Sequence, residues 1–472
     1  MRTLALVLLS AACGGDKKTT ETAASSPEAG PTFYADVLPI VGENCQQCHN
    51  STSPMGSAFP LEEYAQVKAF APGLLAKMQP EGDSTDPFFM PPFSARSTED
   101  CTPEHDFKGI YQPTQDELDV FAAWIEAGTP EGDPADTPEY TVPPVVTLPG
   151  EVETLTFSGE YTVPDADTDG YDTFRCFAMQ LDNGNFSVDG TVWLDGMAFE
   201  PGNSRVAHHM LLFTVPNIQS HMASGLIEDP ENNSWTCAGG VSRADGSYPL
   251  GQAKLAWGWV PGGLPLELGN GMGMRLEAGT GLVVQMHYNT LAAGEDMTDQ
   301  STLLVRPMDE LPEREAFFTL FGVASQGASD EVDDPPFEVP LGAANHIESY
   351  TEIMGDEGIR LWGFIPHMHL AGTALKYTQL SADGSERCLV NVPRYDYNWQ
   401  QMYAYDADWV DLPVIEGGDA LKVECTYDNS DANVMLEKYV GGPVEGGIRL
   451  GDGTSDEMCL VGVGLACDGL CD

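Results

Sequence analysis

The residues of this chain that could bind redox metals fall into two groups of histidines, each in an apolar segment. One group offers three imidazoles, and the other offers two imidazoles and a methionine further along the chain. Imidazole nitrogen suits several transition metals, whereas a thioether sulfur is soft and selects copper over zinc or magnesium. The sequence therefore predicts two copper ions, with a first site at His208, His209 and His287 and a second site at His367, His369 and Met458.

The spacing of the histidines decides how each group could reach one ion, because neighbouring residues of a strand point to opposite faces. His367 and His369 are two residues apart, so in a strand they would share a face. His208 and His209 are adjacent and could converge only from a strand end or a β-bulge. A lone histidine is more often a core residue, but five of the nine histidines lie in these groups, which favours metal binding. The histidines without such neighbours are expected to be structural or surface residues: His105, His221 and His346.

Cys45, Cys48 and His49 form a further redox signature, a CxxCH sequence near the start of the chain. In c-type cytochromes the two thiols attach haem covalently and the histidine binds its iron. A redox-active CxxC or a chance match is the alternative. Met90 is the preferred second iron ligand, because the prolines after it hold an extended loop, and Met78 is the competing residue. A histidine–methionine pair would raise the reduction potential of the haem.

The first 13 residues, 1–13, have the pattern of a bacterial lipoprotein signal, with a short basic start, an apolar core and small residues before Cys13. An ordinary secretory signal is the alternative, and either would export the protein to the periplasm or the cell surface. Lipidation would fall on Cys13, and residues 14–31 would form a flexible tether. No other stretch approaches the roughly 20 apolar residues of a membrane span, so membrane contact is expected only through the lipid.

Charge and length limit the remaining alternatives. The chain has 472 residues and a formal net charge of -52, from 73 acidic and 21 basic residues. This length suits about three domains. The charge makes nucleic acid and anionic membrane surfaces poor partners.

The fold is predicted to be mainly β, after a small α-helical domain resembling cytochrome c over residues 32–133. Helices are expected at 33–41 and 61–70, and a third is expected from the capping box at Thr114–Glu117 to Gly128. Residues 134–151 are rich in proline and acidic residues and are expected to form a linker.

Residues after 151 contain many short apolar runs separated by Gly, Pro, Asn and Asp, which is typical of antiparallel sandwiches or barrels. About 320 residues exceed one ordinary sandwich, so two consecutive antiparallel β-sandwiches are expected, at 152–311 and 312–472. The clearest predicted strands are 191–194, 210–215, 281–288, 361–365 and 420–427.

Five segments of this β region resemble, in order, the copper type II, ascorbate-dependent monooxygenases, the group that contains peptidylglycine hydroxylase and dopamine beta-monooxygenase. Their sequences are DTFRC, HHMLLF, VQMHY, HMHLAG and GTSDEMC, at residues 172–176, 208–213, 284–288, 367–372 and 453–459. The resemblance implies two jelly-roll-like sandwiches that carry the two copper sites.

The resemblance also implies a reaction. Dioxygen would bind at the second site, so that His367, His369 and Met458 are the catalytic ligands, and a C–H bond of a small organic substrate would become an alcohol. The first site would store an electron and deliver it across a solvent-filled gap. The protein's part would be to position the metals that carry the chemistry.

Two departures from the family pattern limit what can be transferred. Ile365 and Gly462 stand where the peptide-amidating enzymes have an arginine and a tyrosine that hold a carboxylate, so peptide amidation is not expected and a neutral or cationic substrate fits better. The other departure is the haem domain, which would pass electrons from a periplasmic donor, such as a cytochrome or an ascorbate-like reductant, to the copper core. A haem that only senses redox state is the alternative. A non-catalytic copper and haem electron-transfer or copper-binding protein is the alternative for the whole chain.

Cysteine usage agrees with an oxidising compartment. The chain has 11 cysteines, and removing Cys13, Cys45 and Cys48 leaves eight that could form disulfides. The family resemblance implies a bridge from Cys425 to Cys459 beside the methionine ligand, where it would brace Met458. A bridge between Cys176 and Cys237 is a weaker expectation. Sequence leaves the connectivity of four others open: Cys101, Cys388, Cys467 and Cys471.

Overall fold

A computed structural model gives the fold. It describes residues 30–51, 59–79, 90–143, 147–164, 172–179, 191–237, 240–277, 279–290, 297–323, 337–355, 358–451 and 453–471. The expected signal, Cys13 and nearly all of the tether lie outside these residues. Within them, no helix is both long and apolar enough to cross a membrane.

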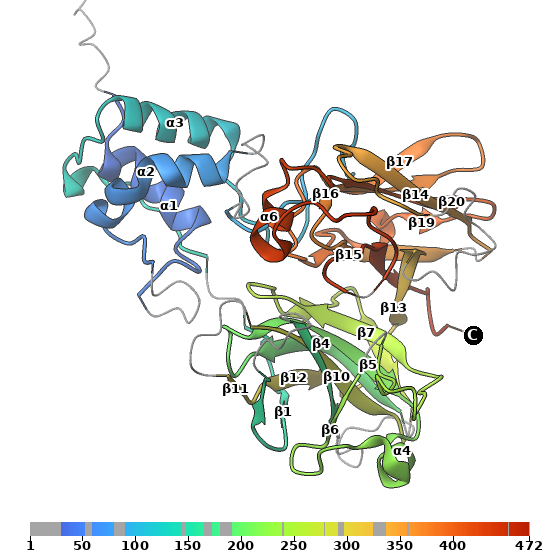
Figure 1. Cartoon of the computed structure of the whole chain (residues 1–472). Coiled ribbons are helices and arrows are strands. Elements are labelled where there is room, and N and C mark those ends of the chain that lie inside the picture. The colour runs from blue at the N-terminus through green and yellow to red at the C-terminus, as the bar shows by residue number, and fades with distance from the viewer. Residues whose placement is uncertain are drawn as a thin grey trace, which may run out of the picture.

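The N-terminal part is helical, as the sequence predicts, and forms a separate body at the upper left of Figure 1. Its main helices are α1 (Leu38–Asn44), α2 (Tyr64–Met78) and α3 (Gln115–Glu126), with a π-helical turn η1 (Phe33–Val37) before α1. Thr114 caps α3 with both hydrogen bonds of the expected capping box. The core of this body is apolar and includes Phe33, Val67, Met78, Phe121 and Trp124.

Residues 90–112, which we call the crossover segment, leave the helical body and pack on the β region. Phe93 and Ala95 belong to the core of the β region. The backbone N–H of Lys108 donates to the carbonyl of Ala404 over 2.8 Å, and Cys101 is joined to Cys388 by a disulfide. Figure 1 shows the segment, in light blue, running over the C-terminal part of the chain. The predicted haem domain 32–133 thus contains a segment that packs with the β region.

The first sandwich packs a five-stranded sheet, with order β6-β3-β10-β5-β7, against one half of a larger sheet, with order β1-β12-β4-β9. The strands of the five-stranded sheet are β3 (Asp172–Met179), β5 (Ala207–Val215), β6 (Ser234–Thr236), β7 (Lys254–Trp259) and β10 (Gly281–Asn289). Those of the facing layer are β1 (Glu153–Thr156), β4 (Val192–Glu200), β8 (Leu266–Glu267), β9 (Met272–Leu276) and β12 (Thr302–Pro307), with β8 paired to β4. A small ribbon pairs β2 (Tyr161–Thr162) with β11 (Thr298–Asp299), and the short helices are η2 (Pro134–Asp136), α4 (Ile218–His221) and η3 (Met222–Leu226).

The second sandwich packs a four-stranded sheet, with order β14-β20-β16-β17, against the other half of the large sheet. The four strands are β14 (His346–Ile353), β16 (Gly372–Leu380), β17 (Glu386–Val392) and β20 (Ala420–Tyr427). The facing half contains β13 (Arg314–Val323), β15 (Ile359–His367), β18 (Tyr403–Ala404), β19 (Val414–Ile415) and β21 (Cys459–Ala466). Two short helices, η4 (Trp409–Asp411) and α6 (Val434–Val440), complete this half of the molecule.

The mainly β fold with sandwiches is the one that the sequence predicts, but the two halves are joined more closely than two independent domains. Arg314–Ala316 of β13 pair in parallel with Met272–Met274 of β9, so one ten-stranded sheet runs through both sandwiches. A single apolar core likewise spans both. The five-stranded sheet and the ten-stranded sheet therefore share one apolar core. The chain passes from the first sandwich to the second between β12 and β13.

Candidate metal centre

The first site is built on two neighbouring strands, β5 and β10. His209 stands directly opposite His287 in the antiparallel register. The next pair is Ala207 with Tyr288, so His208 is the extra residue of a β-bulge. The bulge turns His208 to the same side as His209, as the adjacency of the two histidines predicts.

The three imidazoles of the first site bring their Nδ1 atoms close together. Nδ1 of His209 lies 3.2 Å from Nδ1 of His208 and 3.4 Å from Nδ1 of His287. The three side chains offer ligand atoms that all lie within 4.8 Å of one another. Burial, followed by the charge of neighbouring imidazoles, lowers the pKa of His208 to about 3 and holds that of His209 well below its usual value. Three imidazole nitrogens this close to one another could all bind one copper ion, so the donor set fits the metal.

Asp172 orients the third ligand of the first site. Its Oδ1 accepts a hydrogen bond from Nε2 of His287 over 2.9 Å, which leaves Nδ1 of that ring for a metal. Burial alone would raise the pKa of the Asp172 carboxyl, but hydrogen bonds from His287 and Thr454 hold it well below its usual range. Asp172 therefore remains a carboxylate at neutral pH.

The second site lies where β15 ends. His367 is the last residue of the strand and His369 follows it, with ring centroids 5.2 Å apart. The pair therefore meets at a strand end, rather than on one face of a strand as the spacing predicts. Nδ1 of His367 lies 2.6 Å from Oε1 of Gln400, and Nδ1 of His369 lies 3.0 Å from the carbonyl of Asp456. Both rings thus keep Nε2 for a metal.

Met458 belongs to the segment that faces His369. In the antiparallel register of β15 with β21, His367 pairs with Leu460, and Nδ1 of His369 contacts the carbonyl of Asp456, two residues before Met458. The buried carboxyl group of Glu457 accepts hydrogen bonds from the backbone N–H groups of His369, over 2.8 Å, and Ala371, over 2.7 Å. Burial raises the pKa of Glu457 to about 8. This carboxyl group ties the methionine segment to the histidine turn.

Disulfides brace the same framework. The bridge expected from Cys425 to Cys459 is present, directly after Met458, and so is the bridge from Cys176 to Cys237. The connectivity that sequence left open consists of two bridges, Cys101 to Cys388 and Cys467 to Cys471.

The two sites are in contact across the interface between the sandwiches. The rings of His209 and His367 have centroids 6.3 Å apart. Tyr397 lies between the sites, with its ring stacked on His208 at 4.7 Å and 6.4 Å from that of His369. The resemblance implies a solvent-filled gap here, and in this structure aromatic rings fill the space between those ligands instead.

Sequence reasoning gave no role to Asp172, Tyr397, Gln400, Thr454 or Glu457. Asp172, Thr454 and Glu457 lie inside the segments that carry the resemblance, so their positions were visible but not their contacts. Tyr397 and Gln400 lie in a loop with no metal-binding pattern, and only the folded chain brings them to the histidines.

The two residues at which this chain departs from the family pattern face each other. Ile365 of β15 pairs directly with Gly462 of β21. A Cβ on Gly462 would meet Cβ of Ile365 at 3.2 Å, and a Cβ on Gly258 of the first sandwich would meet Cδ1 of Ile365 at 3.5 Å. The side chain of Ile365 thus packs over two glycines, and these three residues offer no charged group.

The CxxCH segment forms the turn after α1. Nδ1 of His49 lies 3.0 Å from the carbonyl of Phe59, which leaves Nε2 for an iron ligand bond. Cys45 and Cys48 are thiols, whereas the other eight described cysteines are all in disulfides. Burial, with the neighbouring Cys48 thiol, raises the pKa of Cys45 to about 12. Covalent haem attachment at these residues stays a prediction, and a redox-active CxxC stays its alternative.

Both methionines considered as the second iron ligand lie near the end of α2. Met78 is buried in the helical core, and the backbone N–H of Met90 donates to the carbonyl of Lys77 over 3.1 Å. The choice between the two stays a prediction.

The three remaining histidines of the β region and crossover segment have protein partners, as expected of structural residues. Their ring nitrogens contact a carbonyl, a hydroxyl and a carboxylate, in the pairs His105 with Asp411, His221 with Tyr248 and His346 with Glu348.

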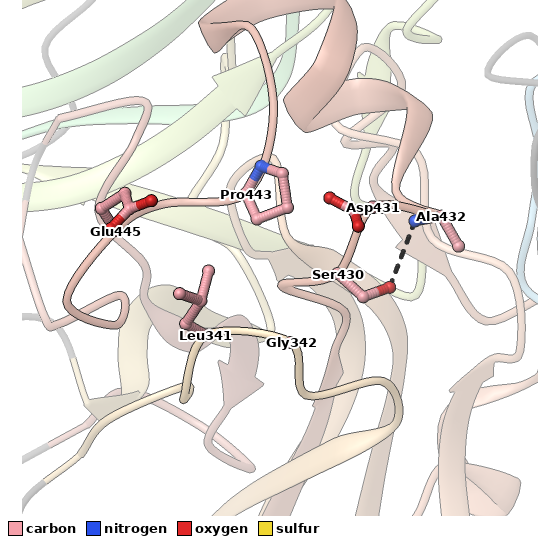
Figure 2. Close-up of a pocket in the computed structure, with 7 residues that line it drawn as sticks. All are labelled: Leu341, Gly342, Ser430, Asp431, Ala432, Pro443 and Glu445. Atoms are coloured by element: carbon pink, nitrogen blue, oxygen red, sulfur yellow. Dashed lines mark hydrogen bonds between the residues drawn. The ribbon is translucent and has the colours of Figure 1, made fainter.

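A surface hollow of about 470 Å³ lies in the second sandwich. Figure 2 shows its lining residues, which are Leu341, Gly342, Ser430, Asp431, Ala432, Pro443 and Glu445. None of them is a candidate metal ligand.

Comparisons with known proteins agree with the site. The chain is 27% identical over 215 residues to "DBH-like monooxygenase protein 1" of Mus musculus, which covers 44% of this chain and 32% of that protein. A Homo sapiens protein whose name also contains "DBH-like monooxygenase" is 25% identical over 283 residues, covering 56% of this chain and 48% of that protein. The matches thus span about a third to a half of the length of these curated relatives.

Among solved structures, the major capsid protein P2 of bacteriophage PM2 aligns at 11% identity over 67% of this chain and 97% of that chain. Its TM-score is 0.26, and a likeness this weak carries no argument.

The family match falls on the second sandwich. Residues 337–463 match the family described as copper type II ascorbate-dependent monooxygenase, C-terminal domain, and this range contains all three residues of the second site. Residues 337–463 therefore carry the C-terminal domain of the copper type II ascorbate-dependent monooxygenase family, and the two relatives extend the similarity to DBH-like monooxygenases.

Proposed function

We propose that this protein is a copper-dependent monooxygenase that uses O₂ to hydroxylate a C–H bond of a small organic substrate, with electrons supplied through the fused c-type haem. The observation that carries the proposal is the meeting of two ligand sets at one interface. Three Nδ1 atoms converge at the first site, and at the second site a histidine pair with free Nε2 atoms faces the segment of Met458. Bound copper would supply oxygen activation at the second site and electron storage at the first.

The protein's contribution is orientation. His287 is held by Asp172, His367 by Gln400 and His369 by the carbonyl of Asp456. Each of these partners occupies the ring nitrogen that the metal does not need, which fixes the ring and its tautomer. The ligands are therefore set for copper before it arrives, which lowers the entropy cost of binding.

The surroundings of Ile365 indicate the class of substrate. Ile365 packs over Gly258 and Gly462 and presents no donor for a carboxylate. A carboxylate needs a charged or hydrogen-bonding partner when it leaves water. A neutral or cationic organic molecule therefore suits this interface better than the carboxylate end of a peptide.

Attachment of the helical body to the copper region supports electron supply through a haem. Cys101 of the crossover segment is bonded to Cys388 of the second sandwich, and Phe107 stacks on Tyr405 with ring centroids 5.3 Å apart. A tethered carrier has a high effective concentration at its partner. The electrons would come from a periplasmic donor, a cytochrome or an ascorbate-like reductant.

Export with a lipid on Cys13 remains part of the proposal and explains where disulfides and a c-type haem could form together. The composition of residues 1–31 supports it. Replacing Cys13 by alanine should release the protein from the membrane fraction into the periplasm or medium. Retention of the variant in that fraction would contradict the lipid anchor.

The test is dioxygen consumption by the copper-loaded, haem-containing chain under reductant, during a screen of small organic substrates for hydroxylated products. Met458→Ala is expected to abolish substrate-dependent uptake. Met222→Ala, a half-buried methionine outside both sites, serves as the matched control and should behave as wild type. Reversible reduction of haem and copper without product across a broad screen would instead favour the non-catalytic electron-transfer or copper-binding protein.

A further inference from the structure

Asp172 lies where the two sandwiches meet and uses both of its carboxylate oxygens. Oδ1 accepts hydrogen bonds from Nε2 of His287 and from Nδ2 of Asn289, each over 2.9 Å. Oδ2 accepts a hydrogen bond from the hydroxyl of Thr454. One oxygen thus serves the first sandwich and the other serves the second.

Thr454 connects this carboxylate to the second site and back to the first. It lies four residues before Met458, in the segment that Glu457 ties to His369. Its Oγ1 is 3.3 Å from the hydroxyl of Tyr397, whose ring stacks on His208. A continuous set of contacts therefore runs from His287 through Asp172 and Thr454 to Tyr397 and ends on His208.

We propose that Asp172 is a positioning residue shared by both metal sites: one oxygen fixes the ring of His287, and the other holds the methionine segment of the second site at a set distance from the first. The inference rests on the proposed function only in taking the two clusters as copper sites. It assigns to Asp172 and Thr454 the task of keeping the sites in contact.

The alternative is that Asp172 only forms an ordinary hydrogen bond across the interface. The two roles predict different effects when Asp172 is replaced. An interface bond affects stability alone. A carboxylate that orients a metal-binding histidine changes metal affinity by roughly 10- to 100-fold when it is lost. A residue that sets the relation of two metals changes their magnetic coupling even where affinity is unaltered.

Asp172→Ala and Thr454→Val distinguish the orientation of His287 from the link between the sandwiches. Asp172→Ala removes both the hydrogen bond to His287 and the hydrogen bond to Thr454. It should weaken Cu(I) binding at the first site by roughly 10- to 100-fold in a chelator competition titration. Thr454→Val removes only the link between the sandwiches. It should leave first-site affinity within about twofold of wild type, but weaken the dipolar coupling of the two Cu(II) ions, read from the broadening and the half-field transition of the EPR spectrum.

Two further variants serve as controls. Asp172→Asn keeps one acceptor oxygen for His287 and should restore most of the first-site affinity that alanine loses. Thr156→Val breaks an exposed threonine pair, 3.0 Å long, within the first sandwich and should change neither readout. Thermal unfolding of each apoprotein shows whether a change reflects loss of fold.

The outcomes distinguish this inference from the proposed function. Unchanged dipolar coupling in folded Thr454→Val, or unchanged first-site affinity in folded Asp172→Ala, would overturn the shared role while leaving the monooxygenase proposal intact. A wild-type chain that binds two Cu(II) ions without dipolar coupling would overturn it as well. A wild-type chain that binds no copper at these histidines would overturn the proposed function and this inference together.

Discussion

The first and second sites both use histidine side chains, but different structural elements position them. The first is built inside one sheet, from the cross-strand pair of His209 with His287 and the bulge at His208. The second is built at a strand end, where His369 and the Met458 segment are held by a buried carboxyl group and a disulfide. A site made by strand register needs few partners, whereas a site at a strand end depends on groups brought from far along the chain.

The largest expected effects are losses of copper from one site without loss from the other. His209→Ala should remove copper from the first site alone, and His369→Ala should remove it from the second alone, because each ring supplies one ligand of one ion. Each variant should halve the copper content and abolish substrate hydroxylation. Metal analysis with EPR of the remaining Cu(II) checks this, and loss of both ions from either variant would mean that the sites cannot be treated separately.

The disulfide next to Met458 should matter more to the second site than to the first. Replacing Cys425 and Cys459 by serine opens a bridge between residues 34 apart, and a loop of that size should cost about 4 kcal/mol of unfolding free energy in the chain-entropy model. The variant should also lose copper from the second site before the first.

The bridge between Cys467 and Cys471 is the control for the disulfide experiment, because its residues are only 4 apart. Its removal should cost about 2 kcal/mol and leave both sites loaded. Denaturant unfolding and metal analysis of both double variants test the comparison, which fails if the two lose equal stability and the same copper.

The loop that contacts the second site should make the apoprotein less stable as pH rises. Asp396 is the neighbour of Tyr397, and burial raises the pKa of its carboxyl to about 6 from 3.8. The folded state therefore keeps a proton that the unfolded chain releases between these pH values. The stability that this carboxyl contributes is present below pH 3.8 and is lost as pH rises through about 6, by about 3 kcal/mol.

Asp396→Asn cannot titrate at this position and should abolish that part of the pH dependence. Denaturant unfolding of the apoprotein at pH 4.5 and pH 7.5 is the measurement. An equal change in unfolding free energy between the two pH values in wild type and variant would show that Asp396 is not the group responsible.

The smallest expected effect concerns one ring of the second site. Gln400→Leu removes the acceptor that lies 2.6 Å from Nδ1 of His367, and should weaken second-site copper binding by about 10-fold while leaving the first site unchanged. Gln401→Leu is the neighbouring control, because the amide of Gln401 bonds to the carbonyl of Pro261 instead. Equal copper affinities for the two variants would mean that Gln400 does not orient His367.

Much of the local structure follows from the sequence, because it depends on short-range periodicity and capping. The strand predicted at 420–427 is β20 residue for residue, and the strand predicted at 281–288 ends one residue short of β10. The cap of α3 is formed by Thr114 and Glu117 as their spacing indicates. Adjacent His208 and His209 require a bulge in a strand, and the register has one.

Contacts between distant segments could not be predicted in the same way. The crossover segment carries helical neighbours on both sides in sequence, so nothing local separates it from the helical body, yet Cys101 bonds to Cys388. The pairing of β9 with β13, which joins the sandwiches into one sheet, involves residues about 40 positions apart with no pattern that marks them as partners.

The sequence by itself determined which ligands the chain offers, the identity of its helical and β regions, and the family to which the metal-binding segments are similar. These follow from residue type and short spacing, which the unfolded chain already possesses. Only the tertiary structure decided that the two sites touch, that Tyr397 lies between them, and that Asp172 reaches both His287 and Thr454. Such contacts join side chains from separate strands and loops, and their geometry exists only after both sandwiches have packed around one core.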